Sequence, residues 1–186
     1  MGLTVYRKWL SLSLFSILLI QYAIAQKGDE VAAKEFQERI DNYLSAKKKQ
    51  DIAKKPTDSA GKLAQEKQQT VKKTQAARPK ARQGDIFTPP VAAYFKKQIE
   101  STLQGTEGEK VRASLRHAEP LPNVQLQVNA KYPRNLPLQS MPPTLLKNLP
   151  LLPKELQYRI VGATLVLYDM ASGLVVDFIP GAVPAA

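Results

Sequence analysis

The sequence predicts an α+β protein: a small antiparallel β-meander covered by one or two helices and preceded by a helical, partly flexible basic arm. Three observations indicate this class. Residues 157–179 alternate like strands around two turns, residues 89–104 place apolar side chains at helical spacing, and residues 26–82 are charged and poor in aromatic residues.

The N-terminal segment, residues 1–25, resembles a secretory signal peptide. Arg7 and Lys8 precede an apolar run that ends in Ala23-Ile24-Ala25, and the polar residue Gln26 follows. Small residues at these positions favour cleavage between Ala25 and Gln26, so we expect export to the periplasm or outside the cell. The alternative is an apolar segment that is kept as a membrane anchor.

Beyond this segment the composition divides the chain at residue 83. Residues 26–82 carry 15 Lys and Arg against 8 Asp and Glu, whereas residues 83–186 carry 10 against 8. The net charge of +11 therefore comes mainly from a basic helical arm at 26–82. We expect 83–186 to form a small α+β domain that folds without this arm.

In the arm, an apolar stripe predicts a helix over about 29–49; it consists of Val31, Phe36, Ile40, Tyr43 and Leu44. A second helix, over 58–77, has only Leu63 and Val71 as large apolar residues, and a helix with so thin a stripe is marginal alone.

Further along, Thr88 and Pro89 are typical of a helix start and Gly105 of a helix end, so a helix is expected over 89–104. A weaker helix is expected over 107–115. Alternation over 124–130 predicts a strand that could join the meander, and a leucine cluster at 145–152 predicts one or two helical turns.

The last strands allow a register to be predicted. The two-residue turn Gly162-Ala163 pairs Val161 with Thr164, and a four-residue turn then pairs Asp169 with Leu174. The expected core face consists of Tyr158, Ile160, Leu165, Leu167, Leu174, Val176 and Phe178. On the other face, this register places Arg159 and Asp177 in one row, as a structural ion pair.

Several of these strings resemble a family of uncharacterised exported bacterial proteins, most specifically over 83–180: Gly84-Asp85-Ile86-Phe87-Thr88, Lys131-Tyr132-Pro133, Met141-Pro142-Pro143, and the runs 152–159 and 165–179. This resemblance implies export and no particular activity. Residues 150–180 are also similar to the C-terminal repeat of small periplasmic proteins, some linked to nickel and cobalt homeostasis, but the His-rich or acidic tracts of metal handling are missing here.

Few residues suggest catalysis. The chain has no cysteine, which excludes disulfides and thiolate sites, and its one histidine, His117, has no neighbouring nucleophile in the sequence. We therefore expect no catalytic, cofactor-binding or metal-binding residues and no cofactor. The alternative is a hydrolase of cell-wall or extracellular polymer that uses Asp177 or Asp169 as its carboxylates.

The basic arm suggests the kind of partner. Its lysines suit an envelope protein or an anionic polymer or lipid surface, while specific nucleic-acid binding is not expected, because the arm lacks a platform of aromatic residues. The sequence thus favours an exported, non-catalytic, envelope-associated or partner-binding module.

Overall fold

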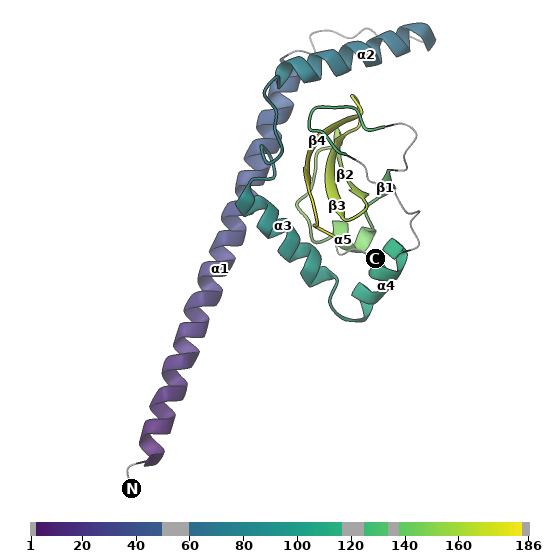
Figure 1. The fold of residues 1–186 in the computed structure, drawn as a ribbon. Helices are drawn as coiled ribbons and strands as arrows, with labels where there is room; N and C mark the ends of the chain where they lie inside the picture. Colours follow the sequence, from purple (N-terminus) through teal and green to yellow (C-terminus); the bar gives the residue numbers. More distant parts are fainter. Residues whose placement is uncertain (1–2, 50–59, 117–124, 134–137, 184–186) are drawn as a thin grey trace.

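The computed structural model describes residues 3–49, 60–116, 125–133 and 138–183, with side chains from residue 26 onward except at 60, 62, 63 and 116. The described residues form five helices and one four-stranded antiparallel sheet of order β1-β2-β3-β4, which confirms the α+β class (Figure 1). The helices are α1 (Leu3–Lys48), α2 (Ala60–Ala77), α3 (Pro89–Thr102), α4 (Gly105–Arg116) and α5 (Pro143–Leu146). The strands are β1 (Gln139–Ser140), β2 (Leu156–Val161), β3 (Thr164–Asp169) and β4 (Leu174–Ile179).

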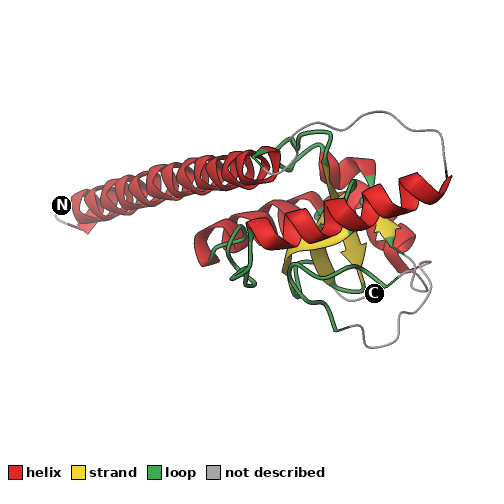
Figure 2. Cartoon of the chain, turned by 90° about the horizontal axis from the view of Figure 1, so that it is seen from above, coloured by secondary structure: helices red, strands yellow, loops and turns green. Residues whose placement is uncertain are grey.

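Helix α1 is longer than the predicted helix over 29–49, because its backbone continues through the expected cleavage site. Its N-terminal part projects away from the remainder of the molecule (Figure 2). The side chains of residues 1–25 lie outside the described part, so the signal peptide and its cleavage after Ala25 stay predictions. Within the described stripe, Val31 is 60% exposed and Ala32 is buried in its place.

The core lies between the sheet and helices α1 and α3. Phe36 of α1 is fully buried, and its ring centroid lies 4.8 Å from that of Phe95 in α3 and 5.7 Å from that of Phe87. Ile40 and Tyr43 of α1 belong to the same cluster as the apolar residues of β2, β3 and β4. The core therefore does not follow the boundary expected at residue 83, because the first helix of the basic arm supplies part of it.

The β2–β3 register is as predicted, with Val161 opposite Thr164 and Tyr158 opposite Leu167. The β3–β4 register was predicted correctly only at its start. Asp169 does pair with Leu174, but a bulge between Leu167 and Tyr168 places Leu167 opposite Asp177. A bulge inserts one unpaired residue into a strand, so every later side chain of β4 moves by one position. Ile179 consequently enters the core expected to hold Phe178, which packs on the opposite face of the sheet.

The strand predicted over 124–130 is wrong for its described part, 125–130, which contains no strand. Instead, residues 129–132 follow the outer side of β4 through three backbone hydrogen bonds and a single bridge between Lys131 and Leu174. The opposite edge of the sheet is formed by β1, which the sequence did not predict and which pairs only with Arg159 and Ile160.

Candidate functional site

The two carboxylates proposed as catalytic, Asp169 and Asp177, are both fully buried. The bulge in β4 turns Asp177 toward the face covered by α1 and the segment before α3, so the two carboxylates share a face, contrary to the predicted register. Each one, however, is enclosed by its own set of hydrogen-bond donors.

Asp169 is held by the C-terminal end of α1. One carboxylate oxygen accepts a hydrogen bond of 2.6 Å from Lys47 Nζ and one of 2.5 Å from the Tyr43 hydroxyl. The other oxygen accepts the backbone N–H groups of Ala171 and Ser172, at 2.9 and 3.1 Å. Burial alone would raise the pKa of Asp169, but the hydrogen bonds from Lys47, Tyr43 and Ser172 hold this pKa below its usual value. Asp169 therefore stays ionised as the counter-charge of a buried lysine.

Asp177 is held by backbone N–H groups. Its two oxygens accept the backbone N–H groups of Gly84, Ile86 and Phe87, at 3.0, 2.8 and 2.8 Å. Gly84 has a φ of +88°, a conformation that glycine adopts without steric cost, and it allows the chain to wrap around the carboxylate. The string Gly84–Phe87, one basis of the family resemblance, is therefore a backbone cradle for Asp177.

The predicted ion pair between Arg159 and Asp177 is wrong. With Val166 opposite Phe178, Asp177 leaves the row that contains Arg159. The Arg159 guanidinium donates instead to Ser140 Oγ, at 2.7 Å, and to the side-chain oxygen of Gln157. Its Nε is buried and has no hydrogen-bond partner among the residues that the structure describes.

Arg159 lines the larger of two described surface pockets, a groove of about 490 Å³ at the β2 edge of the sheet. We call it the β2 groove; its lining residues are Ser140, Met141, Leu146, Pro150, Leu151, Leu152, Leu156, Gln157, Tyr158 and Arg159. Leu146 and Leu151 of this lining are 41% and 89% exposed, so the groove presents apolar surface to solvent. The Tyr158 hydroxyl donates to the Pro150 carbonyl and fixes this rim. The sequence prediction missed the groove, although the leucine and proline cluster at 145–153 was its signal.

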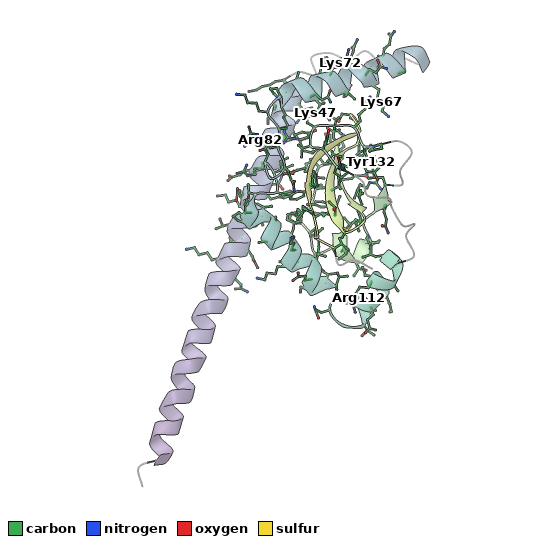
Figure 3. All side chains as sticks on the ribbon, in the orientation of Figure 1. Lys47, Lys67, Lys72, Arg82, Arg112 and Tyr132 are labelled. Atoms are coloured by element: carbon green, nitrogen blue, oxygen red, sulfur yellow. The ribbon has the colours of Figure 1, made fainter. Side chains whose placement is uncertain are left out.

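A second feature is the charge around α2. Exposed cations gather there and on the adjoining ends of neighbouring segments; they are Lys48, Lys49, Lys67, Lys72, Lys80 and Arg82. Figure 3 shows Lys67 and Lys72 on α2, Arg82 below it, and Arg112 on α4, at the other end of the sheet. Across 45–49 and 61–82, Glu66 is the one acidic residue. This end, which we call the α2 basic face, therefore carries a strong local positive charge.

Other candidates add little. His117 lies outside the described residues. Within the described ranges, no three His, Asp or Glu side chains gather as metal ligands would. Among the helical residues whose side chains are described, no stretch is long and apolar enough to span a membrane.

Searches against protein-family models, curated proteins and solved structures found no match for this chain. The resemblance to exported bacterial proteins is thus neither supported nor contradicted by a relative. What the molecule can do has to be inferred from its buried carboxylates, its β2 groove and its α2 basic face.

Proposed function

We propose that this chain is an exported, non-catalytic module that attaches to an anionic polymer or lipid surface of the cell envelope through the α2 basic face. The observation that carries this proposal is the concentration of exposed cations around α2, with Glu66 and Asp85 as the acidic residues of the described segments 61–85. Each basic side chain near an anionic surface contributes about 1 kcal/mol of binding free energy, so several of them acting together suffice for attachment.

The packing of α2 also favours a surface role. Among its described side chains, the buried ones are Thr70, Val71 and Thr74, and both threonine hydroxyls donate to carbonyls one turn earlier in the helix. A helix that buries so little on its own protein leaves most of its circumference available to a partner.

The hydrolase alternative through Asp177 or Asp169 has no support from the geometry. A glycosidase needs two carboxylates that face a substrate cleft, one as acid and one as base or nucleophile. Asp169 and Asp177 are each 0% exposed and are occupied by Lys47 or by backbone amides. Both are better explained as structural groups that tie the N-terminal segments to the sheet.

Export is the other part of the proposal. Cleavage after Ala25 would leave Gln26 as the first residue, and N-terminal sequencing or intact mass of the protein from the extracytoplasmic fraction measures this directly. Recovery of residues 1–25 in a membrane fraction would instead identify the apolar segment as a retained anchor.

Attachment is tested by sedimentation with vesicles of phosphatidylcholine that contain or lack phosphatidylglycerol, and in parallel with immobilised dextran sulfate as a polymer polyanion. The double variant Lys67→Glu/Lys72→Glu should weaken anionic binding at least about tenfold. Lys147→Glu/Lys154→Glu makes the same change in net charge on exposed residues away from α2 and should change it less than about threefold. Equal losses in the two variants would mean that net charge, not the α2 basic face, determines binding. Binding to neither anionic probe would refute the attachment role.

A further inference from the structure

The β2 groove points to a second, independent binding activity. We propose that it accepts an extended peptide segment of another protein, which pairs with the edge of β2 and places a carboxylate against Arg159. This inference does not depend on the α2 basic face.

The position of the groove indicates the conformation of its occupant. Successive side chains of a strand point to opposite faces of the sheet. Four consecutive residues of β2, Leu156 to Arg159, all line the groove, so it follows the edge of the strand and not one face. A ligand in this position lies alongside the backbone of β2.

The edge itself has room for a partner strand. Strand β1 pairs with Arg159 and Ile160 and ends at Ser140, so no described strand pairs with Leu156–Tyr158 on that side. The Leu156 N–H already donates to the Pro153 carbonyl, so the groups left for a partner strand lie mainly at Tyr158. The backbone N–H and C=O groups along a sheet edge are a ready template for an added strand. At about 3.3 Å per residue, this edge suits an extended segment of about three to five residues.

The walls of the groove indicate the side chains of the segment. Leu146, Leu151 and Leu152 present apolar surface, two of them to solvent. Burying them requires apolar side chains on the incoming segment, at about 25 cal/mol for each Å² removed from water. The occupant is therefore an alternating apolar strand and not a sugar or a polyanion.

The charge of the groove completes the description. Arg159 is the one charged residue in its lining; its two terminal nitrogens donate only to neutral oxygens, of Ser140 and Gln157, and its buried Nε has no partner among the described residues. A carboxylate is the complement of a guanidinium, in charge and in paired hydrogen bonding. It can come from an Asp or Glu side chain or from the C-terminus of the partner, and these two sources share the same chemistry.

The test uses four fluorescently labelled pentapeptides and the protein purified in the form that the cell accumulates. The first is acetyl-Val-Thr-Val-Glu-Val-amide, and the second has Gln in place of Glu. The third is the Gln peptide with a free C-terminal carboxylate. The fourth is the Glu peptide with methyl groups on the backbone nitrogens of its second and fourth residues, Thr and Glu. These methyl groups remove two N–H donors of a strand and leave the side chains unchanged. Binding is measured by fluorescence anisotropy.

We expect one of the two carboxylate peptides to bind about tenfold more tightly than the neutral Gln peptide, as for a hydrogen bond to a charged group. Which one binds identifies the source of the carboxylate. N-methylation should abolish binding. Arg159→Gln should reduce the preference to below about twofold, while Lys131→Gln, at an exposed cation on the β4 side of the sheet that belongs to neither proposed binding surface, should leave it unchanged.

Leu151→Glu provides a second variant that is safe for folding, because Leu151 is 89% exposed. It should weaken every binding peptide at least about tenfold, whereas Met170→Glu, at an exposed apolar residue away from the groove, should not. The proposal is overturned if no carboxylate peptide shows saturable binding up to about 1 mM, if the N-methylated peptide binds as well as its parent, or if Arg159→Gln leaves the preference intact.

Discussion

Helices α1 and α2 both belong to the basic arm, yet they relate to the fold in opposite ways. Helix α1 buries Phe36, Ile40 and Tyr43 in the main core and reaches Asp169 with Lys47. Helix α2 buries one large apolar residue, Val71, among its described side chains. The net charge of a segment therefore did not predict whether it packs in the core. The width of its apolar stripe did, because the stripe is wide on α1 and narrow on α2.

The largest effect should follow from removing the arm. Without residues 26–82, the sheet loses the α1 side chains that cover it, and Asp169 keeps a buried charge without its lysine. We expect residues 83–186 alone to show no cooperative transition in thermal or urea unfolding. A cooperative transition in that fragment would mean that the boundary expected at residue 83 is a true domain boundary.

Truncations within each helix sharpen the same comparison. Phe36→Ala removes a fully buried ring that contacts three other aromatic rings and should cost about 3–5 kcal/mol of unfolding free energy. Val71→Ala removes less from a shallower contact and should cost about 1.5 kcal/mol. Urea unfolding at neutral pH measures both losses of unfolding free energy. Equal losses would mean that α2 contributes to the fold as much as α1 does.

The polar end of α1 should be nearly as important. Asp169→Asn leaves the Lys47 ammonium buried without a counter-charge and should cost about 3–5 kcal/mol. Asp177→Asn leaves no cation unpaired but disrupts backbone hydrogen bonds, for about 1–3 kcal/mol. Adding Lys47→Met to Asp169→Asn should recover part of the loss, whereas it should recover nothing in the Asp177→Asn background. Recovery in both backgrounds would contradict a specific Lys47–Asp169 pair.

Acid should lower the unfolding free energy through Asp169, which joins α1 to the sheet. The pKa of Asp169 is lowered on folding, so its contribution is complete above the unfolded value, about 4, and is lost as pH falls through the lower folded value. Urea unfolding from pH 7 to pH 2 should show a steeper acid decline for the native sequence than for Lys47→Met/Asp169→Asn. Parallel declines would mean that other carboxylates govern acid stability.

The smallest effect is expected on α2. Lys67→Glu/Lys72→Glu alters two exposed residues and should shift the unfolding free energy by no more than about 0.5 kcal/mol. A loss above about 2 kcal/mol would show that α2 supports the fold through these lysines, and any loss of vesicle binding could then not be assigned to surface charge.

The elements that depend on local signals were predicted well. As predicted, α3 begins at Pro89, after Thr88, and carries a regular apolar stripe, and the Gly162-Ala163 turn fixes the β2–β3 register. The predicted end at Gly105 is wrong, because α3 ends at Thr102 and Gly105 is the first residue of α4, and the Thr88 hydroxyl donates to Glu35 instead of capping α3. The β3–β4 register failed because a bulge has no distinctive sequence pattern and depends on how β4 packs.

The site was harder to predict for the same reason. The donors that enclose Asp177 are backbone amides about 90 residues earlier in the chain, and backbone amides leave no trace in residue identity. The β2 groove likewise exists because β1 ends after two residues. The prolines around β1 indicate a short strand but not its exact end. Composition did reveal the excess of basic residues, whereas their gathering at one end of the molecule is visible only in the folded chain.

The pairing of Lys47 with Asp169 also bears on the order in which the parts of the fold can form. The two residues are 122 positions apart, and at ~5–20 residues per second Asp169 is synthesised roughly 6–24 s after Lys47. During that interval Phe36, Ile40 and Tyr43 have no sheet to cover, because β2, β3 and β4 are made last. We expect the dense charge of the arm to keep the apolar stripe of α1 soluble until these strands have been made, because net charge opposes aggregation.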